Sequence, residues 1–270
     1  MRELLKLLYC EFAKLRRKPL FFISSALSAL PPLAYALFLS DAATSAEAVE
    51  KMMAAAQQMS AYLLLMPLLV ILASHLLFLE TDNDTRKNLL TIPVSASALA
   101  AAKLLLLLLF SVLFMAVGGL LCLIILLLQG FAPVGFLKLF GVGLLESVLM
   151  WTGALPCILL VTALNKSYII SVIITFFYTI SNYLIAQTDF FLTQPFGLNP
   201  GTLLPGPLTF RWLYPFYSQS DPSAELAALL ERLSPYFLTT AQAFLVALPE
   251  AVLCCTLIAA VYRRQKSLMV

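Results

Sequence analysis

Charged residues are scarce in this chain. Aspartate, glutamate, lysine and arginine make up 11% of its 270 residues, and 61% are hydrophobic. Soluble domains have roughly 25% charged residues, and no soluble fold of this size could bury so much apolar surface. The composition therefore excludes a soluble globular protein and predicts a single helical bundle embedded in a membrane.

Residues for covalent chemistry are also few. His75 is the only histidine, which excludes a metalloprotease with paired histidines, and no serine lies in a G-x-S-x-G sequence. The five cysteines lack the spacing of a metal or redox site. Gly130 and Gly135 have the glycine spacing of a phosphate-binding loop, but Phe136 and Leu137 stand where lysine and serine or threonine are required. We therefore expect no catalytic residue, no metal site and no ATP site in this chain.

Six apolar runs are each long enough to cross a hydrocarbon core of about 30 Å. They comprise residues 20–39, 60–79, 99–128, 139–164, 168–188 and 240–262. The first run also fits the core of a secretory signal, because a basic region precedes it, but such cores are typically about 7 to 15 residues long. The sequence therefore predicts an all-α, polytopic membrane protein, with a transmembrane unit at 19–262 and a cytoplasmic tail at 263–270.

The basic residues predict the orientation. With six spans, thirteen of the seventeen lysines and arginines fall on the side that holds both termini, and cytoplasmic flanks carry such an excess. The other four are Lys51, Lys138, Arg211 and Arg232. Both termini are therefore predicted to be cytoplasmic in a multi-pass protein of the cell membrane. Because these residues flank apolar runs, they argue against nucleic acid as a partner.

Residues 1–18 are predicted to form an amphipathic helix on the cytoplasmic membrane surface, in contact with lipid headgroups. Its apolar face comprises Leu4, Leu5, Leu8, Phe12 and Leu15. Glu11 and Lys14 lie on other faces of this helix.

Two predicted outer segments are longer than turns. Residues 40–59 contain an alanine-rich part that can extend the adjoining helices beyond the bilayer. Residues 189–239 combine a stretch rich in proline and glycine with a short amphipathic helix at 222–233, before the last span. Within this segment, an aromatic stretch that includes Arg211 and Trp212 fits a position among the lipid headgroups or contact with an amphipathic substrate.

One inner loop, residues 80–98, is long enough to form a docking surface. An aspartate can cap a short helix in it, Leu89 and Leu90 give that helix an apolar side, and Pro93 ends it. Lys103, a turn or two into the next span, is expected to extend toward the cytoplasmic headgroups. The alternative interpretation is a solvated turn whose charges only set the topology.

This loop resembles the signature of ABC-2 type transporter permeases, in the lantibiotic-immunity and bacitracin-type branch. The residues that carry the resemblance are Glu80, Thr85, Lys87, Asn88, Leu89, Leu90, Pro93, Val94, Ser95 and Lys103. The order of segments is also similar, with a basic amphipathic N-terminal helix, six spans, and extracellular helices before the last span.

The resemblance implies the permease subunit of a bacterial ATP-binding cassette exporter, which moves an antimicrobial peptide or a lipid-like compound outward. In that family the loop docks on a separate ATPase subunit, expected as a homodimer, that holds ATP and Mg²⁺. A second permease copy, or a similar permease, would complete the transporter. The resemblance assigns ATPase coupling to Glu80, Thr85, Arg86, Lys87, Asn88, Leu89, Leu90 and Pro93.

Two carboxylates, Glu146 and Glu250, lie within predicted spans. A carboxylate at the bilayer centre costs about 2.5 to 3.5 kcal/mol on insertion scales, so such residues are functional candidates. We interpret them as part of a substrate path that contacts cationic groups. In the alternative, Glu146 reaches the outer interface, and Glu250 lies at a helix break after Pro249, hydrogen-bonded or protonated.

Two other functions stay open at this level. A secondary transporter or channel could use the same carboxylates for protons or cations, although the chain lacks the repeated halves common in such transporters. A scaffold or sensor subunit that transports nothing is the third reading, which the mostly short loops disfavour.

Overall fold

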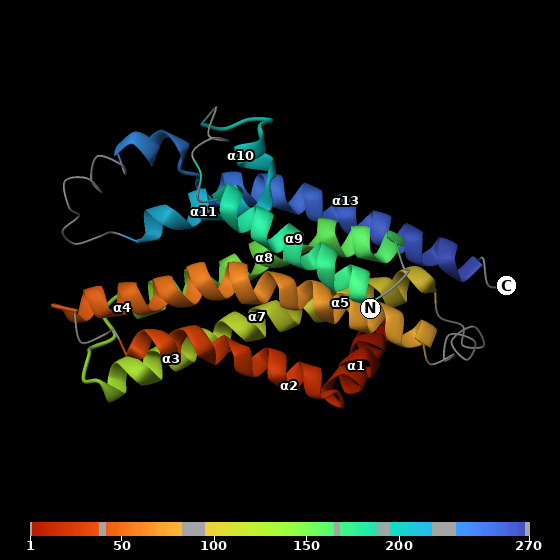
Figure 1. The fold of residues 1–270 in the computed structure, drawn as a ribbon, viewed down its shortest axis with the longest axis horizontal. Helices are drawn as coiled ribbons and strands as arrows, with labels where there is room; N and C mark the ends of the chain where they lie inside the picture. Colours follow the sequence, from red (N-terminus) through yellow and green to blue (C-terminus); the bar gives the residue numbers. More distant parts are fainter. Residues whose placement is uncertain are drawn as a thin grey trace.

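The computed structural model is an elongated bundle of helices (Figure 1). It describes residues 2–37, 42–82, 95–164, 168–186, 188, 195–217 and 231–267, and these residues contain helices but no strand. Six helical segments in the described part are long and apolar enough to cross a membrane. They are Pro19–Ala36, Ser45–Leu77, Ala96–Leu128, Phe136–Leu164, Ile169–Ala186 and Thr240–Arg264. The predicted all-α, multi-pass fold class is confirmed.

The chain begins with α1 (Arg2–Arg16), followed by a first span made of three short pieces. These are α2 (Pro19–Ala26), the 3₁₀ turn η1 (Leu27–Ala29) and α3 (Leu30–Ala36). Pro31 and Pro32 lie in the first turn of α3, where a proline is tolerated because its missing N–H would have no helical partner. The two prolines therefore explain why the span is divided at this point.

The second span begins earlier than its apolar run. Thr44 caps α4 (Ser45–Ala54) by accepting a hydrogen bond of 3.2 Å from the Glu47 N–H. The helix continues through the π-helical segment η3 (Ala55–Leu65) into α5 (Met66–Asp82). Pro67 cannot donate to the preceding turn, so the regular hydrogen-bond ladder is interrupted where η3 ends. The predicted outer segment at 40–59 is thus largely the start of this helix.

The third and fourth spans form the centre of the bundle. Ser95 caps α7 (Ala96–Leu128) through the Ala98 N–H at 3.1 Å. Gly130 and Gly135, with φ of 84° and 76°, shape the turn that leads to α8 (Phe136–Leu164), because glycine adopts positive φ at little cost. Helix α8 packs against α5, α7 and α13 (Thr240–Ser267), so it is the helix around which the core is arranged.

The segment before the last span folds over one side of α8 and α9 (Tyr168–Ala186). It contains α10 (Pro200–Leu203), α11 (Pro205–Leu213), η5 (Tyr214–Phe216) and η6 (Ser234–Tyr236). A methyl group at Gly153 of α8 would come within 2.6 Å of Pro205, so glycine is what allows α11 to approach this closely. Most of the predicted helix at 222–233 lies outside the described residues.

Arg211 and Trp212 are buried in this segment, so their side chains contact protein and not the surroundings. Arg211 is 5% exposed and donates hydrogen bonds to the carbonyl oxygens of Tyr236 and Gly201, both at 2.6 Å, and of Pro195. Burial lowers the pKa of the guanidinium, but arginine stays protonated in proteins. Trp212 packs into a cluster with Leu149 and Leu208. These two side chains thus attach the segment to the bundle through buried contacts.

Helix α13 runs through Pro249 without interruption. The expected helix break beside Glu250 is therefore wrong. Proline is tolerated within membrane helices because neighbouring groups and local adjustments can satisfy the backbone.

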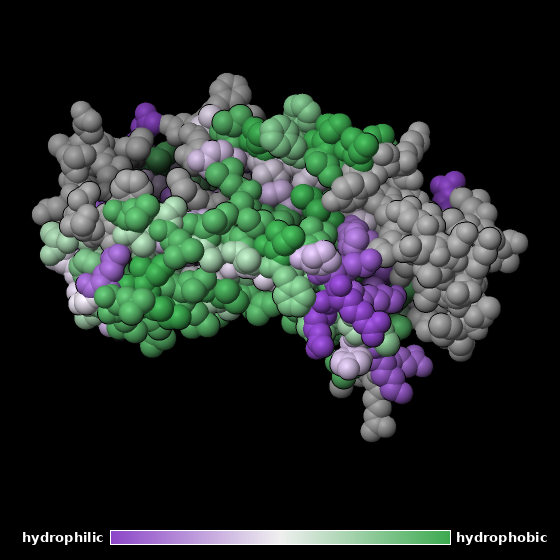
Figure 2. Space-filling model, turned by 60° about the horizontal axis from the view of Figure 1, so that its bottom comes forward, coloured by the Kyte–Doolittle hydropathy of each residue, from purple (hydrophilic) through white to green (hydrophobic). Residues whose placement is uncertain are grey.

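The two ends of the bundle differ in character. Both termini lie toward one end, together with the end of α5 and the start of α7, whereas α11 and the α7–α8 turn lie toward the other (Figure 1). Figure 2 shows hydrophilic residues gathered over α1 at the first end, beside a broad hydrophobic face. The cytoplasmic placement of both termini stays a prediction from the positive-inside rule.

Replacing Arg211 with methionine removes the buried donors while keeping an unbranched side chain. We expect the apparent Tm of the purified protein in detergent to fall by about 5 °C or more, because several buried carbonyl oxygens lose a charged donor. Fluorimetric thermal unfolding measures this change. The exposed Lys138→Met is the control and should unfold like the wild type. Equal unfolding of both variants would show that other contacts hold the outer segment.

Candidate functional site

Most residues assigned to ATPase coupling lie outside the described residues. This holds for Thr85, Arg86, Lys87, Asn88, Leu89, Leu90 and Pro93, and only the backbone of Glu80 is described, near the end of α5. The structure describes the two arms of the loop instead. Helix α5 leads into residues 83–94, α7 leads out of them, and the two helices pack against each other.

Lys103 joins these arms to the N-terminal helix. Its side chain is 2% exposed, and its Nζ donates a hydrogen bond of 2.6 Å to the Leu76 carbonyl oxygen of α5. The same Nζ forms an ion pair with Glu11 Oε2 of α1 at 3.1 Å. The expected extension of Lys103 toward the headgroups is therefore wrong, because α1 packs on α7 and brings a carboxylate to the lysine inside the bundle.

Helix α1 turns its charged side inward at one position. Glu11 is 1% exposed and lies between Lys103 and Lys14, whose Nζ is 2.5 Å from Glu11 Oε1. Of the predicted apolar face, Leu15 is buried and packs into the main core, whereas Leu5 and Phe12 are exposed. Thus α1 is attached to the bundle through a buried ion pair as well as through apolar contacts.

This arrangement can transmit movement. A single side chain contacts α1, α5 and α7, and two of these helices hold the ends of residues 83–94. Breaking one partner of a buried ion pair typically costs 3–5 kcal/mol, so the three helices are expected to move together. No short-range sequence pattern pairs Glu11 with Lys103, because the two are far apart in the chain.

The two intramembrane carboxylates have different surroundings. Glu146 of α8 is 0% exposed, and neither carboxylate oxygen has a hydrogen-bond partner among the described atoms. The alternative in which it reaches the outer interface is therefore wrong. Glu250 of α13 is partly exposed and lies within electrostatic range of Tyr178, whereas Glu146 acts on Tyr62 and Tyr217. The two carboxylates thus have different neighbours.

We name Glu146, Gln57, Tyr62 and Tyr217 the Glu146 cluster, because both tyrosines lie within electrostatic range of Glu146 and Gln57 is hydrogen-bonded to Tyr217. The Tyr62 hydroxyl donates to the Gly206 carbonyl oxygen at 2.9 Å, and the Tyr217 hydroxyl donates to Gln57 Oε1. Gln57 Nε2 donates to the Leu139 carbonyl oxygen at 2.7 Å. The cluster therefore connects η3, α8 and the segment that contains α11.

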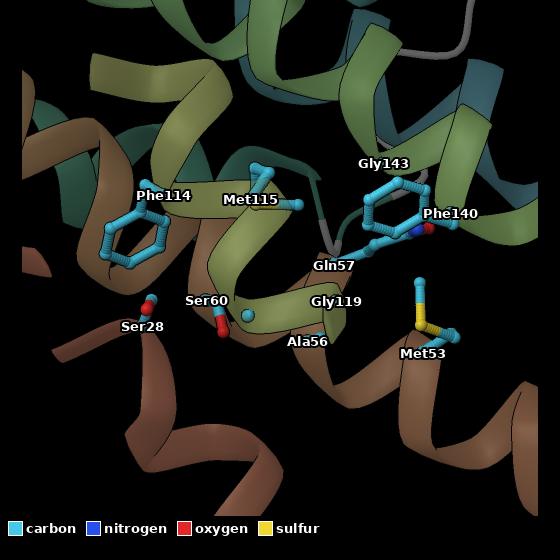
Figure 3. Close-up of a pocket in the computed structure, with 11 residues that line it drawn as sticks. Ser28, Met53, Ala56, Gln57, Ser60, Phe114, Met115, Gly119, Phe140 and Gly143 are labelled. Atoms are coloured by element: carbon cyan, nitrogen blue, oxygen red, sulfur yellow. The ribbon is translucent and has the colours of Figure 1, made fainter. Parts of the chain in front are cut away.

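A small cavity lies beside this cluster (Figure 3). Its volume is about 10 Å³, roughly the room that one water molecule needs. Figure 3 shows Ser28 and Ser60 on facing helices and Gln57 extending toward Gly143 of α8. The Ser60 hydroxyl is buried without a hydrogen-bond partner among the described atoms. The cavity is therefore polar on the side of η3.

Sequence reasoning missed Gln57, Ser60 and Tyr62. The signal available for these three was a pair of glutamines and a serine at the start of an apolar run. Tyr217 belongs to the aromatic stretch considered for substrate contact, but only tertiary folding brings it to Gln57. Among the described residues, no group of histidine, cysteine, aspartate and glutamate side chains could hold a metal ion.

Comparison with known families decides the class of protein. The model of a family described as ABC-2 family transporter protein matches residues 7–182, more than half of the chain. The chain belongs to the ABC-2 transporter family. It is thus the permease component of an ABC transporter, a class that works in general with an ABC ATPase. No curated protein matches the chain.

The match covers one of the two sites described above wholly and the other in part. It includes most of α1, both arms of the loop, η3 and Glu146, and it ends within α9. Tyr217, α11 and Glu250 lie beyond it. The Lys103 contact of this ABC-2 permease therefore lies wholly within the family region, whereas the Glu146 cluster combines family and non-family segments.

Replacing Lys103 with methionine should destabilise the permease, because Glu11 then stays buried without a cation. We expect a lower apparent Tm in detergent, and a smaller loss for Lys103→Met combined with Glu11→Gln than the sum of the two single losses. The exposed Lys6→Met on α1 is the control. Additive losses in the double variant would mean that the two side chains are not energetically coupled.

Proposed function

We propose that this chain is the permease subunit of an ABC exporter that moves an amphipathic substrate out of the cytoplasm or the membrane. A separate ATPase homodimer, which holds ATP and Mg²⁺, would dock on residues 83–94. The observation that carries this proposal is the family match across both arms of that loop. The narrower assignment, to the lantibiotic-immunity and bacitracin-type branch and to antibiotic resistance, rests on the resemblance of the loop sequence.

The contacts of the two arms support the coupling role. A displacement of residues 83–94 by the ATPase would move α5 and α7, which flank them. The ion pair of Lys103 with Glu11 would then move α1 as well. Helix α5 is also the direct continuation of η3, so its displacement reaches the cavity beside Gln57. π-Helical turns occur frequently at functional sites. ATP-driven movement would thereby reach the middle of the permease.

The substrate path is proposed to include Glu146 and Glu250. Glu146 is the stronger candidate for a substrate contact, because it is fully buried and its carboxylate oxygens have no partner among the described atoms. An exporter of this class would also contain two permeases, either two copies of this chain or this chain with a similar one. Membrane lipids are the remaining partners.

The unpartnered carboxyl group of Glu146 also favours one alternative. A secondary transporter or channel would use such a group to bind a proton or a cation. The two functions differ in their source of energy. Transport that requires an associated ATPase supports the exporter, whereas transport that follows an ion gradient without any ATPase supports the alternative.

Affinity capture of the tagged permease from its native membrane in mild detergent tests the coupling role. We expect the wild type to recover an ABC ATPase and the variant Lys87→Glu/Leu90→Asp to lose it. The matched control is Lys138→Glu/Leu137→Asp, which makes the same two changes at exposed positions in the first turn of α8. Recovery of no ATPase with the wild type would contradict the exporter and favour a gradient-driven function.

A further inference from the structure

Two tyrosine hydroxyls, those of Tyr62 and Tyr217, lie within electrostatic range of Glu146, and both have already donated their hydrogens. The hydroxyl hydrogen of Tyr62 goes to the Gly206 carbonyl oxygen, and that of Tyr217 goes to Gln57 Oε1. The amide of Gln57 donates to Leu139. Tyr62 also has a side-chain hydrogen bond with Thr209, and what the two tyrosines then retain are oxygen lone pairs. This explains why neither oxygen of Glu146 has a partner in the described structure.

Cations of the described interior are engaged elsewhere. Lys103 is paired with Glu11, and the Arg211 guanidinium donates to carbonyl oxygens of its own segment. The titratable groups that act on the same place are the hydroxyls of Tyr62 from η3 and of Tyr217 after η5, with Glu50 and Cys122 acting on Tyr217. Burial raises the pKa of Tyr217 well above its ordinary value, so its hydroxyl stays neutral. Nothing among these groups supplies a positive charge to Glu146.

An ionised carboxylate in such a place costs several kcal/mol unless a cation or hydrogen-bond donors reach it. An ammonium group supplies both, because it carries a positive charge and has several N–H donors. These N–H donors can form hydrogen bonds with the two carboxylate oxygens and with a lone pair of a tyrosine hydroxyl. A neutral hydroxyl or an anion would leave the charge unbalanced.

We propose that Glu146, Tyr62 and Tyr217 bind the ammonium group of an amphipathic amine, and that a proton occupies the Glu146 carboxyl group when the amine is absent. This proposal deepens the proposed function, on which it rests, by naming the substrate class. In the exchange, the O–H bond of the carboxyl group breaks, the proton leaves to water, and the carboxylate pairs with the ammonium group. Each bound amine thus releases one proton.

The small cavity adjoins the cluster through Gln57, and Glu146, Tyr62 and Tyr217 do not line it. Its lining combines the polar Gln57 and Ser60 with the apolar Phe114, Met115 and Phe140, which suits a polar head followed by a hydrocarbon part. A methyl group at Gly143 would come within 2.7 Å of Gln57 Nε2, so η3 and α8 are in close contact. Since the cavity holds about one water molecule, the amine enters only when these helices separate.

Infrared difference spectroscopy of the full chain in phosphatidylcholine nanodiscs tests the proposal. The probe is dodecylamine, and dodecanol is the neutral control of the same chain length. We expect dodecylamine to convert one carboxylic acid signal into a carboxylate signal in the wild type. Dodecanol should leave the signal unchanged. The same conversion with both probes, or with neither, would overturn the proposal.

Variants assign the signal to its residue. Glu146→Gln should abolish the conversion and weaken dodecylamine binding about tenfold or more, which corresponds to about 1.4 kcal/mol. Glu47→Gln is the control, because it removes a partly exposed carboxyl group of α4 that pairs with Lys51, and it should respond like the wild type. A wild-type response in Glu146→Gln would place the amine elsewhere.

A second variant covers the case in which Glu146→Gln does not fold. Tyr217→Phe removes a hydroxyl lone pair but keeps the carboxyl group, so we expect the conversion to persist at a higher dodecylamine concentration. Unchanged binding would remove Tyr217 from the site. Because no ATPase is present in this assay, amine binding can succeed where ATPase capture fails, and the reverse. The two proposals are therefore tested separately.

Discussion

The contact of Lys103 with Glu11 and the Leu76 carbonyl oxygen holds α1 to α5 and α7, the two helices that flank residues 83–94. In a membrane, each polar group must find its partner within the protein, because lipid supplies none. Lys103 meets this constraint by drawing α1 against α7, and α1 is thereby fixed beside both arms of the loop. The N-terminal helix is consequently joined to both helices that flank residues 83–94.

At the opposite end of the bundle, buried polar groups also need partners within the protein, but only some of them find one. Arg211 satisfies its donors with backbone carbonyl oxygens and so holds the segment of α10 and α11 over α8 and α9. Glu146 belongs to α8, on which α11 packs, and its own oxygens have no partner in the described structure. The segment over α8 therefore satisfies its buried donors within the chain, whereas Glu146 has no donor among the described atoms.

One continuous helix relates the two ends. From Ser45 to Asp82 the chain passes through α4, η3 and α5, and apolar packing buries Val49, Met52 and Met53 near its start. Run length placed this span at residue 60, because Gln57 and its polar neighbours lower the local hydropathy. Packing against α7 and α8 outweighs that local signal and makes the element long enough to reach both the loop and the cavity.

The sequence by itself determined the properties that depend on composition and run length: a membrane protein, six spans, and a loop typical of the ABC-2 family. It also indicated that Glu146 and Glu250 are carboxylates within apolar spans, where charged residues are rare. Only the tertiary structure decided which polar groups are satisfied, with Lys103 paired, Arg211 buried and Glu146 without a partner among the described atoms. The physical reason is that the free energy of a buried polar group depends on atoms brought to it from distant parts of the chain, which no local pattern records.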